Sequence, residues 1–456
     1  MASRMPRVKL GIVAGIVLIV GACVVCSCAP AAPSDSQEAV EEQVTDAGFD
    51  VLSAKQPYRN QYTEGIVLDF QADLAENFPY QFYTFATEKE RDGVKYGHST
   101  TQGKVEGPWL KNFGGQPILT EDGLYQISGY TWDKETNTWS LAQPGDPSTL
   151  NMAARCYACK STAKFNELYD QYGNEAFGMQ MDQEAMDFVG GDFWGCGSCH
   201  EDGNAPAEGA TSQSIFFNTI LGDDGETLSD EDKACGQCHN GTFITGKCVD
   251  PEYFENARPF RYGFDADSLI RAQIEDGDLG VEAGIPRGGG MHADMEVFQG
   301  SNHDINGLTC VSCHMPTLTA EDGTVFTDHD ASQSPLENTA SLELCLTCHK
   351  TQGIESTDEM IEMVRGKQAE AGELETELRE KLDMLEEHIA EVEAAGTADE
   401  ATIKAMYDAL TTADFYTEYC VGSYAEPGIK IAHNPTAIFD YLNRADKLID
   451  DAMAMA

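Results

Sequence analysis

Five pairs of cysteines in this chain share one spacing, Cys-x-x-Cys, and a basic residue directly follows each pair. Two thiols at this spacing can bond covalently to the edge of a porphyrin, and the next side chain then falls under the iron as its proximal ligand. The motifs therefore predict five c-type haems. Their residues are Cys156, Cys159 and Lys160; Cys196, Cys199 and His200; Cys235, Cys238 and His239; Cys310, Cys313 and His314; and Cys345, Cys348 and His349.

The first motif differs from the others because its basic residue is Lys160 rather than a histidine. An amine binds a metal through a free lone pair, so Lys160 has to lose a proton that a free lysine holds up to about pH 10.4. Zinc is the alternative cofactor, but zinc sites combine two cysteine or histidine pairs and do not require a basic residue after every second cysteine. The pattern favours haem over zinc or iron–sulfur and marks one iron as different.

The other histidines can be compared with the number of ligands that such haems need. The chain has 10 histidines, four of them in the motifs. A haem that only transfers electrons is best held by two strong ligands, which leave no open site on the iron. His388 is expected on the surface of a helix, and His292, beside a glycine-rich turn, is left for an active site with Lys160. The candidate distal ligands stand in turn-like sequences and are His98, His303, His329 and His433.

The charge of the chain limits its partners. A formal net charge of −48 predicts a solvated acidic surface and argues against nucleic acid, because phosphate contacts need lysine and arginine. It is compatible with basic redox partners. A local basic excess lies between the third and fourth motifs and includes Arg258, Arg261 and Arg287. These arginines either pair with nearby carboxylates or form an entry path for an anionic substrate.

The first 28 residues have the features of an export signal, a basic start followed by an apolar run. Cys23 lies in a lipoprotein-like cleavage box, Cys26 and Cys28 form a weaker candidate, and an uncleaved anchor is the alternative. Residues 29–54 are expected to be an acidic tether. Export also permits a disulfide between the remaining cysteines, Cys248 and Cys420, and two unrelated buried thiols are the alternative.

The rest of the chain divides into a motif-bearing part, residues 55–350, and a helical part, residues 351–456, which we expect to belong to one domain. The first is expected to be loop-rich and packed around haem. In the second, an apolar seam predicts a long helix. A second helix is expected from Ala398 to about Tyr419, with Thr397 or Asp399 as the capping residue near its N-terminus, and a third is expected to follow Pro435. The fold class is mainly α. The seam residues are Leu378, Leu382, Leu385, Ile389 and Val392.

These residues resemble the ammonia-forming cytochrome c nitrite reductases, the pentahaem cytochrome c552 family with one lysine-ligated haem. The order of the motifs is similar, and the resemblance runs from about His98 to His433. It implies that His292 is the active-site histidine and that the Lys160 haem binds substrate on its open face. It also implies closely spaced haems that form an electron path, and a homodimer formed through the C-terminal helices. The similar stretches are Tyr96–His98, His292–Glu296, Gly300–His303, Cys310–Pro316, Phe326–His329 and His433–Pro435.

The chain also departs from that family. The family has an active-site arginine shortly before the lysine haem, but here no arginine stands between Arg91 and Arg155. The family's glutamate and tyrosine after the third motif are replaced by Asn240 and Gly241, and its calcium-binding Lys-x-Gln by Gly289-Gly290-Met291. A calcium site is therefore doubtful. Arg287, Arg258 or Arg261 is the candidate for the missing charge.

The resemblance implies reduction of nitrite to ammonium by six electrons and eight protons, with four bis-histidine haems supplying the electrons and His292 the protons. The alternatives are an electron-transfer cytochrome that serves a separate reductase, or a reductase of another small acceptor. The missing arginine, tyrosine and calcium ligands favour the electron-transfer cytochrome, whereas Lys160 and His292 favour nitrite reduction. We expect an exported protein, anchored by lipid or by an N-terminal helix, that receives electrons from a membrane quinol-oxidising cytochrome.

Overall fold

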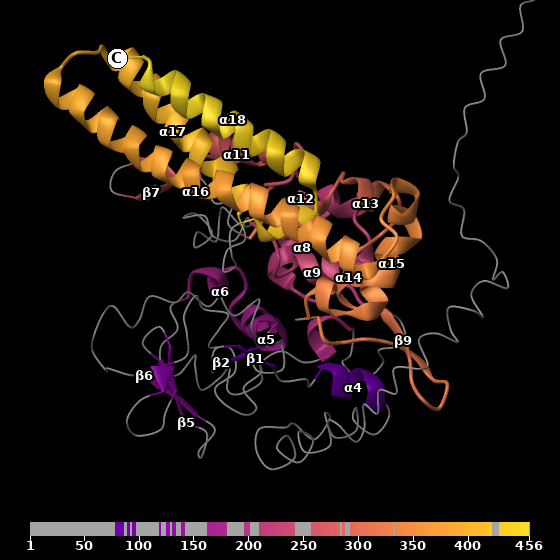
Figure 1. Cartoon of the computed structure of the whole chain (residues 1–456). Coiled ribbons are helices and arrows are strands. Elements are labelled where there is room, and N and C mark those ends of the chain that lie inside the picture. Colours follow the sequence, from indigo (N-terminus) through magenta and orange to yellow (C-terminus); the bar gives the residue numbers. More distant parts are fainter. Residues whose placement is uncertain are drawn as a thin grey trace, which may run out of the picture.

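The computed structural model describes most of the second half of the chain and shorter parts of the first (Figure 1). The described ranges are 78–85, 162–179, 196–200, 209–241, 257–282, 292–331, 333–421 and 428–455, with short strands between 89 and 141 and at 285–287. Several predicted sites lie outside them: the leader with Cys23, the tether, His98, Cys248, and the first motif with Cys156, Cys159 and Lys160. Of Cys196 and Arg287, only the backbone is described.

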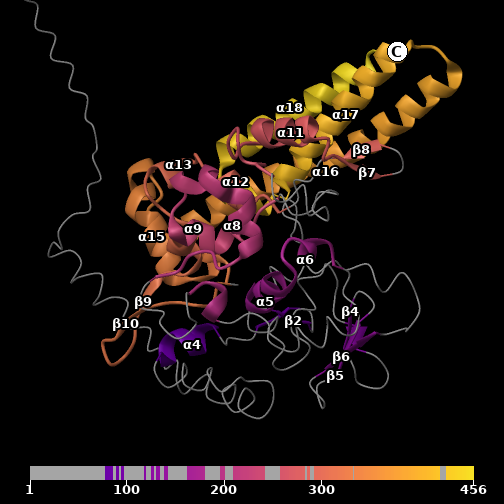
Figure 2. The same ribbon diagram turned by 180° about the vertical axis from the view of Figure 1, so that it is seen from behind.

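Three long helices at the C-terminal end lie side by side and extend away from the rest of the molecule (Figures 1 and 2). They are α16 (Thr357–Ala395), α17 (Glu400–Cys420) and α18 (Pro435–Met453). Because the connection between α16 and α17 is short, the two helices run antiparallel, and α18 packs against both of them. The predictions of a mainly helical fold and of these three helices are confirmed.

The ends of these helices follow from local sequence. The Ser356 hydroxyl accepts from the Glu359 N–H at 3.2 Å, and the Glu359 carboxylate accepts from the Ser356 N–H at 3.3 Å, so both free donors at the start of α16 are satisfied. α16 ends at Gly396, whose φ of 63° favours glycine. Asp399 caps α17 by accepting from the Thr402 N–H at 2.8 Å. Of the two predicted starts of α17, Asp399 is therefore the one used.

The apolar seam of α16 faces the other helices of its own chain. Leu378, Leu385 and Ile389 are fully buried, and the other two seam residues are nearly so. Their neighbours lie on α17 and α18, so contacts within one chain already account for the seam. The homodimer stays a prediction that does not depend on these residues.

His388 lies deeper than predicted. It precedes the seam residue Ile389 and therefore sits at the edge of the buried stripe of α16 rather than on its outer face. Its side chain is half-buried, and its Nε2 atom is shielded from solvent. The sequence around it is rich in glutamate, which suggested an exposed position that the helical phase does not give.

Shorter helices form the part of the molecule that carries the cysteine motifs. None of the helices in the described ranges is both long and apolar enough to cross a membrane. The α-helices are α4 (Pro79–Phe85), α5 (Thr162–Tyr172), α6 (Glu175–Gly178), α8 (Ile215–Leu221), α9 (Asp230–Gly236), α11 (Ala266–Asp276), α12 (Asp294–Phe298), α13 (Asn302–Ile305), α14 (Cys310–His314) and α15 (Thr339–His349). Single 3₁₀ turns are η6 (Cys196–Ser198), η8 (Gly222–Thr227), η11 (Pro335–Glu337), η12 (Lys350–Gln352) and η13 (Ile429–Ala432).

The strands are short and all antiparallel. β3 (Ile118–Leu119), β4 (Tyr125–Ile127), β5 (Tyr130–Asp133) and β6 (Thr138–Leu141) form one sheet in chain order. The other strands pair two by two: β1 (Lys89–Arg91) with β2 (Val94–Tyr96), β7 (Gly280–Glu282) with β8 (Ile285–Arg287), and β9 (Thr317–Thr319) with β10 (Val325–Thr327). The last hairpin matters for the site, because β10 leads directly to His329.

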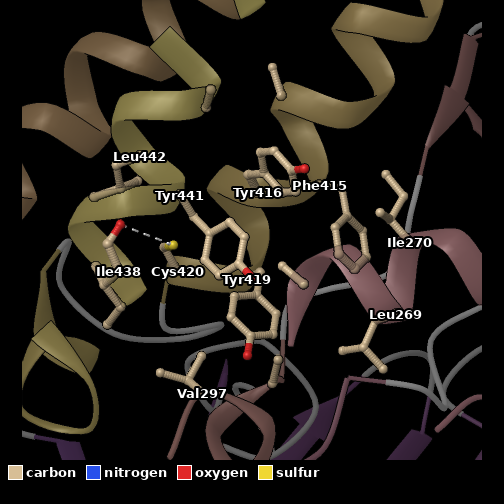
Figure 3. Close-up of a cluster of buried hydrophobic side chains, with 14 of the residues drawn as sticks. Leu269, Ile270, Val297, Phe415, Tyr416, Tyr419, Cys420, Ile438, Tyr441 and Leu442 are labelled. Atoms are coloured by element: carbon tan, nitrogen blue, oxygen red, sulfur yellow. Dashed lines mark hydrogen bonds between the residues drawn. The ribbon is translucent and has the colours of Figure 1, made fainter. Parts of the chain in front are cut away.

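An apolar core joins the bundle to the helices beneath it (Figure 3). Phe415 of α17 lies beside Leu269 and Ile270 of α11, and Tyr419 of the same helix packs against Tyr441 of α18. The Tyr419 and Tyr441 rings are 5.6 Å apart and nearly perpendicular, an arrangement that aromatic pairs favour. The bundle is therefore held firmly against the motif-bearing part.

Cys420 belongs to this core and is fully buried. Its thiol donates to the Ile438 carbonyl at 3.7 Å. Its proposed disulfide partner, Cys248, lies outside the described residues.

Candidate metal centres

The four described motifs lie on short helical turns. In a helix, side chains three and four positions apart share one face, so both cysteines and the following histidine of a motif point the same way. α14 is the fourth motif itself, α15 ends at the histidine of the fifth, and the third continues α9 through a 3.0 Å bond from the His239 N–H to the Cys235 carbonyl. Local helical geometry thus arranges each motif for a ligand bound from one side.

Three of the motif histidines each face a predicted distal histidine from elsewhere in the chain. The paired rings, with the distances between their centres, are His200 and His329 at 6.3 Å, His303 and His349 at 6.3 Å, and His314 and His433 at 6.2 Å. A metal–imidazole bond of about 2.0 Å, together with about 1.1 Å from each ring centre to its nitrogen, puts two opposed rings about 6.2 Å apart. The three separations therefore fit pairs of imidazoles on opposite sides of an iron.

The hydrogen bonds of these rings are also those expected of metal-binding histidines. A metal-binding histidine usually donates its second ring nitrogen to a carbonyl or carboxylate, which fixes the ring and leaves the other nitrogen for the metal. The His200 Nδ1 is 2.9 Å from the Gly209 carbonyl, and the His329 Nδ1 is 2.8 Å from the Thr327 carbonyl. The His303 ring is hydrogen-bonded to the backbone of Ala432.

Burial keeps these imidazoles in the neutral form that binds a metal. It lowers the pKa of His314 to about 4, with nearby His433 and His239 adding to the effect. Burial likewise lowers the pKa of the other paired rings for which a shift is resolved, namely His200, His303, His329 and His433.

Elements distant in sequence hold His329 in place. The Thr84 hydroxyl of α4 accepts from the His329 N–H at 2.9 Å, and Tyr80 of the same helix stacks on Phe326 of β10 with ring centres 5.0 Å apart. Figure 1 shows α4 beside the β9–β10 hairpin. A segment far upstream of the motifs therefore helps to position this ring.

Successive motifs are tied to one another. The Gln237 amide of the third donates to the Ser198 carbonyl of the second at 2.7 Å. The Cys310 N–H of the fourth donates to Asp232 beside the third at 2.9 Å, and the Cys235 and Cys310 thiols are in hydrogen-bond contact. Ser341 of α15 donates to the Cys313 carbonyl at 2.7 Å, which connects the fourth motif to the fifth. Groups bound at these motifs would be neighbours in chain order.

The remaining motif histidine, His239 of the third motif, is held by α12. Its Nδ1 lies 3.3 Å from the Asp294 Oδ2, and its carbonyl accepts from the Met295 N–H at 3.0 Å. The Glu296 Oε1 accepts from the Gly241 N–H at 2.8 Å. The approach is tight, since a Cβ on Gly236 would stand 2.4 Å from the Met295 sulfur. α12 thus sits directly on the third motif.

Glu296 and Asp294 were not singled out from the sequence, although both lie just after His292. Burial raises the pKa of Glu296 to about 8. Burial would also raise the pKa of Asp294, but the charges of Lys430 and His239 hold it well below its usual range. The sequence could have pointed to these two carboxylates, because they lie two and four positions after the candidate active-site histidine, His292.

His292 is half-buried at the start of α12, and its carbonyl accepts from the Asp294 N–H at 2.7 Å. It therefore lies near the third motif. The arginines predicted to meet an anion are placed differently. Arg261 makes two 2.9 Å bonds to Asp276 at the end of α11, so local carboxylates use its charge. The exposed Arg258 donates to the carbonyl of its neighbour Ala257 at 2.6 Å.

No three His, Cys, Asp or Glu side chains in the described part of the chain converge to hold a further metal ion.

Comparison with known proteins agrees with the sequence resemblance. The cytochrome c552 family pattern matches residues 71–456. The chain is similar to two proteins named cytochrome c-552 from strains of Haemophilus influenzae. One is 23% identical over 379 residues, covering 77% of this chain and 67% of the relative. The other is 25% identical over 304 residues, covering 60% of this chain and 54% of the relative. The chain thus spans between about half and two thirds of these relatives.

Among solved structures, the fold is similar to that of the catalytic subunit of a cytochrome c nitrite reductase from Desulfovibrio desulfuricans. The TM-score is 0.58 at 17% identity, and the match covers 84% of this chain and 85% of that one. The structure of that protein is described with two calcium sites. At this identity the likeness establishes a shared fold.

Proposed function

This chain belongs to the cytochrome c552 family, and from that membership we propose that it is a pentahaem cytochrome that reduces nitrite to ammonium. The observation that best supports the proposal is the set of three histidine pairs, each spaced for one iron and each joining a motif histidine to a predicted distal one. A zinc or iron–sulfur protein with the same cysteines would have no use for such pairs.

The pairs supply a ligand assignment. We assign His200 with His329, His349 with His303, and His314 with His433. We then pair His239 with His98, the distal candidate that lies outside the described residues. Lys160 would hold the remaining haem, that of the first motif, where a small anion could bind. When bound, haem supplies one-electron chemistry and a place for a small anion to bind.

The arrangement of the motifs suits a reaction that needs many electrons. Reduction of one nitrite to one ammonium and two waters consumes six electrons and eight protons, so electrons must reach one place repeatedly. The hydrogen bonds from Gln237 to Ser198, from Cys310 to Asp232 and from Ser341 to Cys313 hold consecutive motifs at fixed spacing. Bis-histidine sites change little on oxidation, which favours fast transfer along such a row.

We assign His292 the delivery of protons to the substrate. Imidazole titrates near neutral pH and can donate and recover a proton during each turnover. His292 lies at the start of α12, and α12 is hydrogen-bonded to the third motif. Arg287 and Arg258 remain the candidates for orienting the anion, whereas Arg261 is engaged with Asp276.

The proposal includes an exported protein that receives electrons from a membrane quinol-oxidising cytochrome or a similar donor. Cys23 is its lipidation site, unless the leader is kept as an uncleaved helical anchor. The homodimer is proposed on the family resemblance, and a calcium site stays doubtful because the family's Lys-x-Gln is replaced by Gly289-Gly290-Met291.

The decisive experiment is anaerobic nitrite reduction by the purified protein with a reduced viologen dye, with ammonium quantified. One ammonium per six electrons at a fast turnover supports the proposal. A protein that carries five haems and forms no ammonium contradicts it. That outcome would favour electron transfer to a separate reductase, for which the missing arginine and tyrosine are the supporting observation, or reduction of another small acceptor.

A further inference from the structure

Lys430 is 1% exposed, which is unusual because lysine is rarely buried without a partner. It lies on η13, the turn that leads to His433. Its Nζ donates to the Tyr419 carbonyl at 3.4 Å and lies 3.6 Å from the Asp294 Oδ1. Lys430 thus makes one ion pair, with Asp294, and one hydrogen bond, with Tyr419.

Lys430 stands where the bundle meets the motifs. The acidic side chains near Lys430 are Asp294 and Glu296 of α12 and Glu375 of α16. α17 contributes the Tyr419 carbonyl and the Cys420 thiol. Figure 3 shows this side of α17 beside Val297 of α12.

Asp294 connects Lys430 to the third motif. One of its oxygens faces the ammonium group, and the other lies 3.3 Å from the His239 Nδ1. A carboxylate on the second nitrogen of a metal-binding histidine makes that ring a stronger donor, which favours the oxidised metal. Lys430 opposes this effect because it draws negative charge away from the ring.

The same lysine acts on a second site. The charge of Lys430 also lowers the pKa of His433, although burial lowers it more. The ring centres of His433 and His314 are 6.2 Å apart. Asn434, the next residue, donates to the Val297 carbonyl of α12 at 3.1 Å, so His433 and α12 keep a fixed relation. One buried cation therefore lies near two of the proposed iron sites.

We propose that Lys430 is a fixed internal cation that raises the reduction potentials of the haems held by His239 and by His314 with His433. One-electron reduction lowers the charge of an iron site by one, so a nearby positive charge favours the reduced form, and screening by water is weak at a buried position. The inference rests on the haem ligation proposed above but not on the substrate.

The alternative is that Lys430 merely anchors η13. Three variants separate the two roles. Lys430→Met removes the charge and keeps most of the length, Lys430→Gln also keeps a donor for the Tyr419 carbonyl, and Lys430→Arg keeps the charge. Lys404→Met is the charge-matched control, since Lys404 is 74% exposed on α17 and pairs with Asp408 in its own helix.

The test is a spectroelectrochemical titration of each purified protein, with electron paramagnetic resonance to separate the haems and a haemochrome assay to count them. In Lys430→Met and Lys430→Gln, we expect one or two of the five midpoint potentials to fall, by about tenfold in the equilibrium constant, which is 59 mV for one electron. Lys430→Arg and Lys404→Met should leave all five near the wild-type values.

Unchanged potentials in either uncharged variant with five haems would overturn the proposal, as would an equal shift in Lys404→Met. If Lys430→Met does not accumulate, Lys430→Gln alone decides. The outcome is independent of nitrite: a wild-type protein that makes no ammonium, but whose uncharged variants show the shift, would refute the proposed substrate and support this role of Lys430.

Discussion

At the scale of single residues, the assignment of His329 as a distal ligand gives a direct spectroscopic prediction. Its ring centre lies 6.3 Å from that of His200, and its removal leaves the cysteines and proximal histidine of the second motif intact. His329→Ala should therefore keep five haems and convert one of them from low spin to high spin. Electron paramagnetic resonance of the oxidised protein would show the new signal.

His388→Ala is the matched control, because His388 is also half-buried but belongs to the edge of the α16 seam. It should leave the spectrum unchanged. If both variants retain wild-type spectra, His329 is not a ligand, and the pairing with His200 has another cause.

His292 carries a kinetic prediction. Loss of a positioned proton donor typically slows catalysis by about a hundredfold or more, so His292→Ala should lower kcat for nitrite by at least that factor. The spin states of the bis-histidine haems should not change, since His292 is not a proposed ligand. The assay follows oxidation of reduced viologen, and an unchanged kcat would remove His292 from the mechanism.

The sequence predicted local features of the site much better than distant ones. The motifs and their proximal ligands follow from spacing within one helical turn. The four distal candidates came from counting histidines, but which ring faces which motif depends on how β10, α13 and η13 fold back, and the structure was needed to pair His329 with His200. Lys430 gave no signal, because nothing in Gly428–His433 predicts that a lysine is buried there.

At the scale of elements, the bundle should depend on the α16 seam. Leu385 is fully buried against α17 and α18, whereas Met384, its neighbour, is 52% exposed. Truncation of a buried leucine to alanine costs about 2–5 kcal/mol, and an exposed site costs much less. Leu385→Ala should therefore lower the free energy of unfolding of the bundle by that amount. Denaturant titrations followed by circular dichroism measure it.

Met384→Ala, one position away, should change stability by less than about 0.5 kcal/mol. Equal losses in the two variants would mean that the seam is not the packing face. The seam could be predicted because its period is a property of one helix. The surface that it packs against could not be predicted, because the same pattern suits a dimer contact or a contact with α17 and α18.

Glu375 gives the bundle a pH dependence. It is 1% exposed on α16, and its Oε2 accepts from the Gly428 N–H at 2.7 Å. Burial raises the pKa of this carboxyl to about 7, although Gly428, Arg379 and Lys430 act in the opposite direction. The folded protein therefore keeps a proton that the unfolded chain loses near pH 4.3. Stability falls as the pH rises between these values, by at most about 4 kcal/mol.

Glu375→Gln should remove this dependence, because the amide oxygen still accepts from Gly428 and carries no charge. The Tm difference from wild type should be small at about pH 5 and favour the variant at about pH 8. Glu373→Gln, at an exposed position of the same helix, is the control. A Tm difference that stays constant between these two pH values would show that Glu375 does not titrate as proposed.

At the scale of the whole molecule, the net charge of −48 predicts opposite salt effects for the two reactants. An anionic substrate is repelled on approach and a basic electron donor is attracted, and salt screens both effects. Between about 10 mM and 0.2 M salt, kcat/KM for nitrite should rise by about twofold or more, while the rate of reduction by a basic donor protein should fall by a larger factor. Stopped-flow and steady-state assays across this range measure both.

A fall in kcat/KM for nitrite would instead mean that a local positive field outweighs the acidic surface. Arg258→Gln and Arg287→Gln would then identify its source, because loss of the responsible arginine should restore the rise with salt.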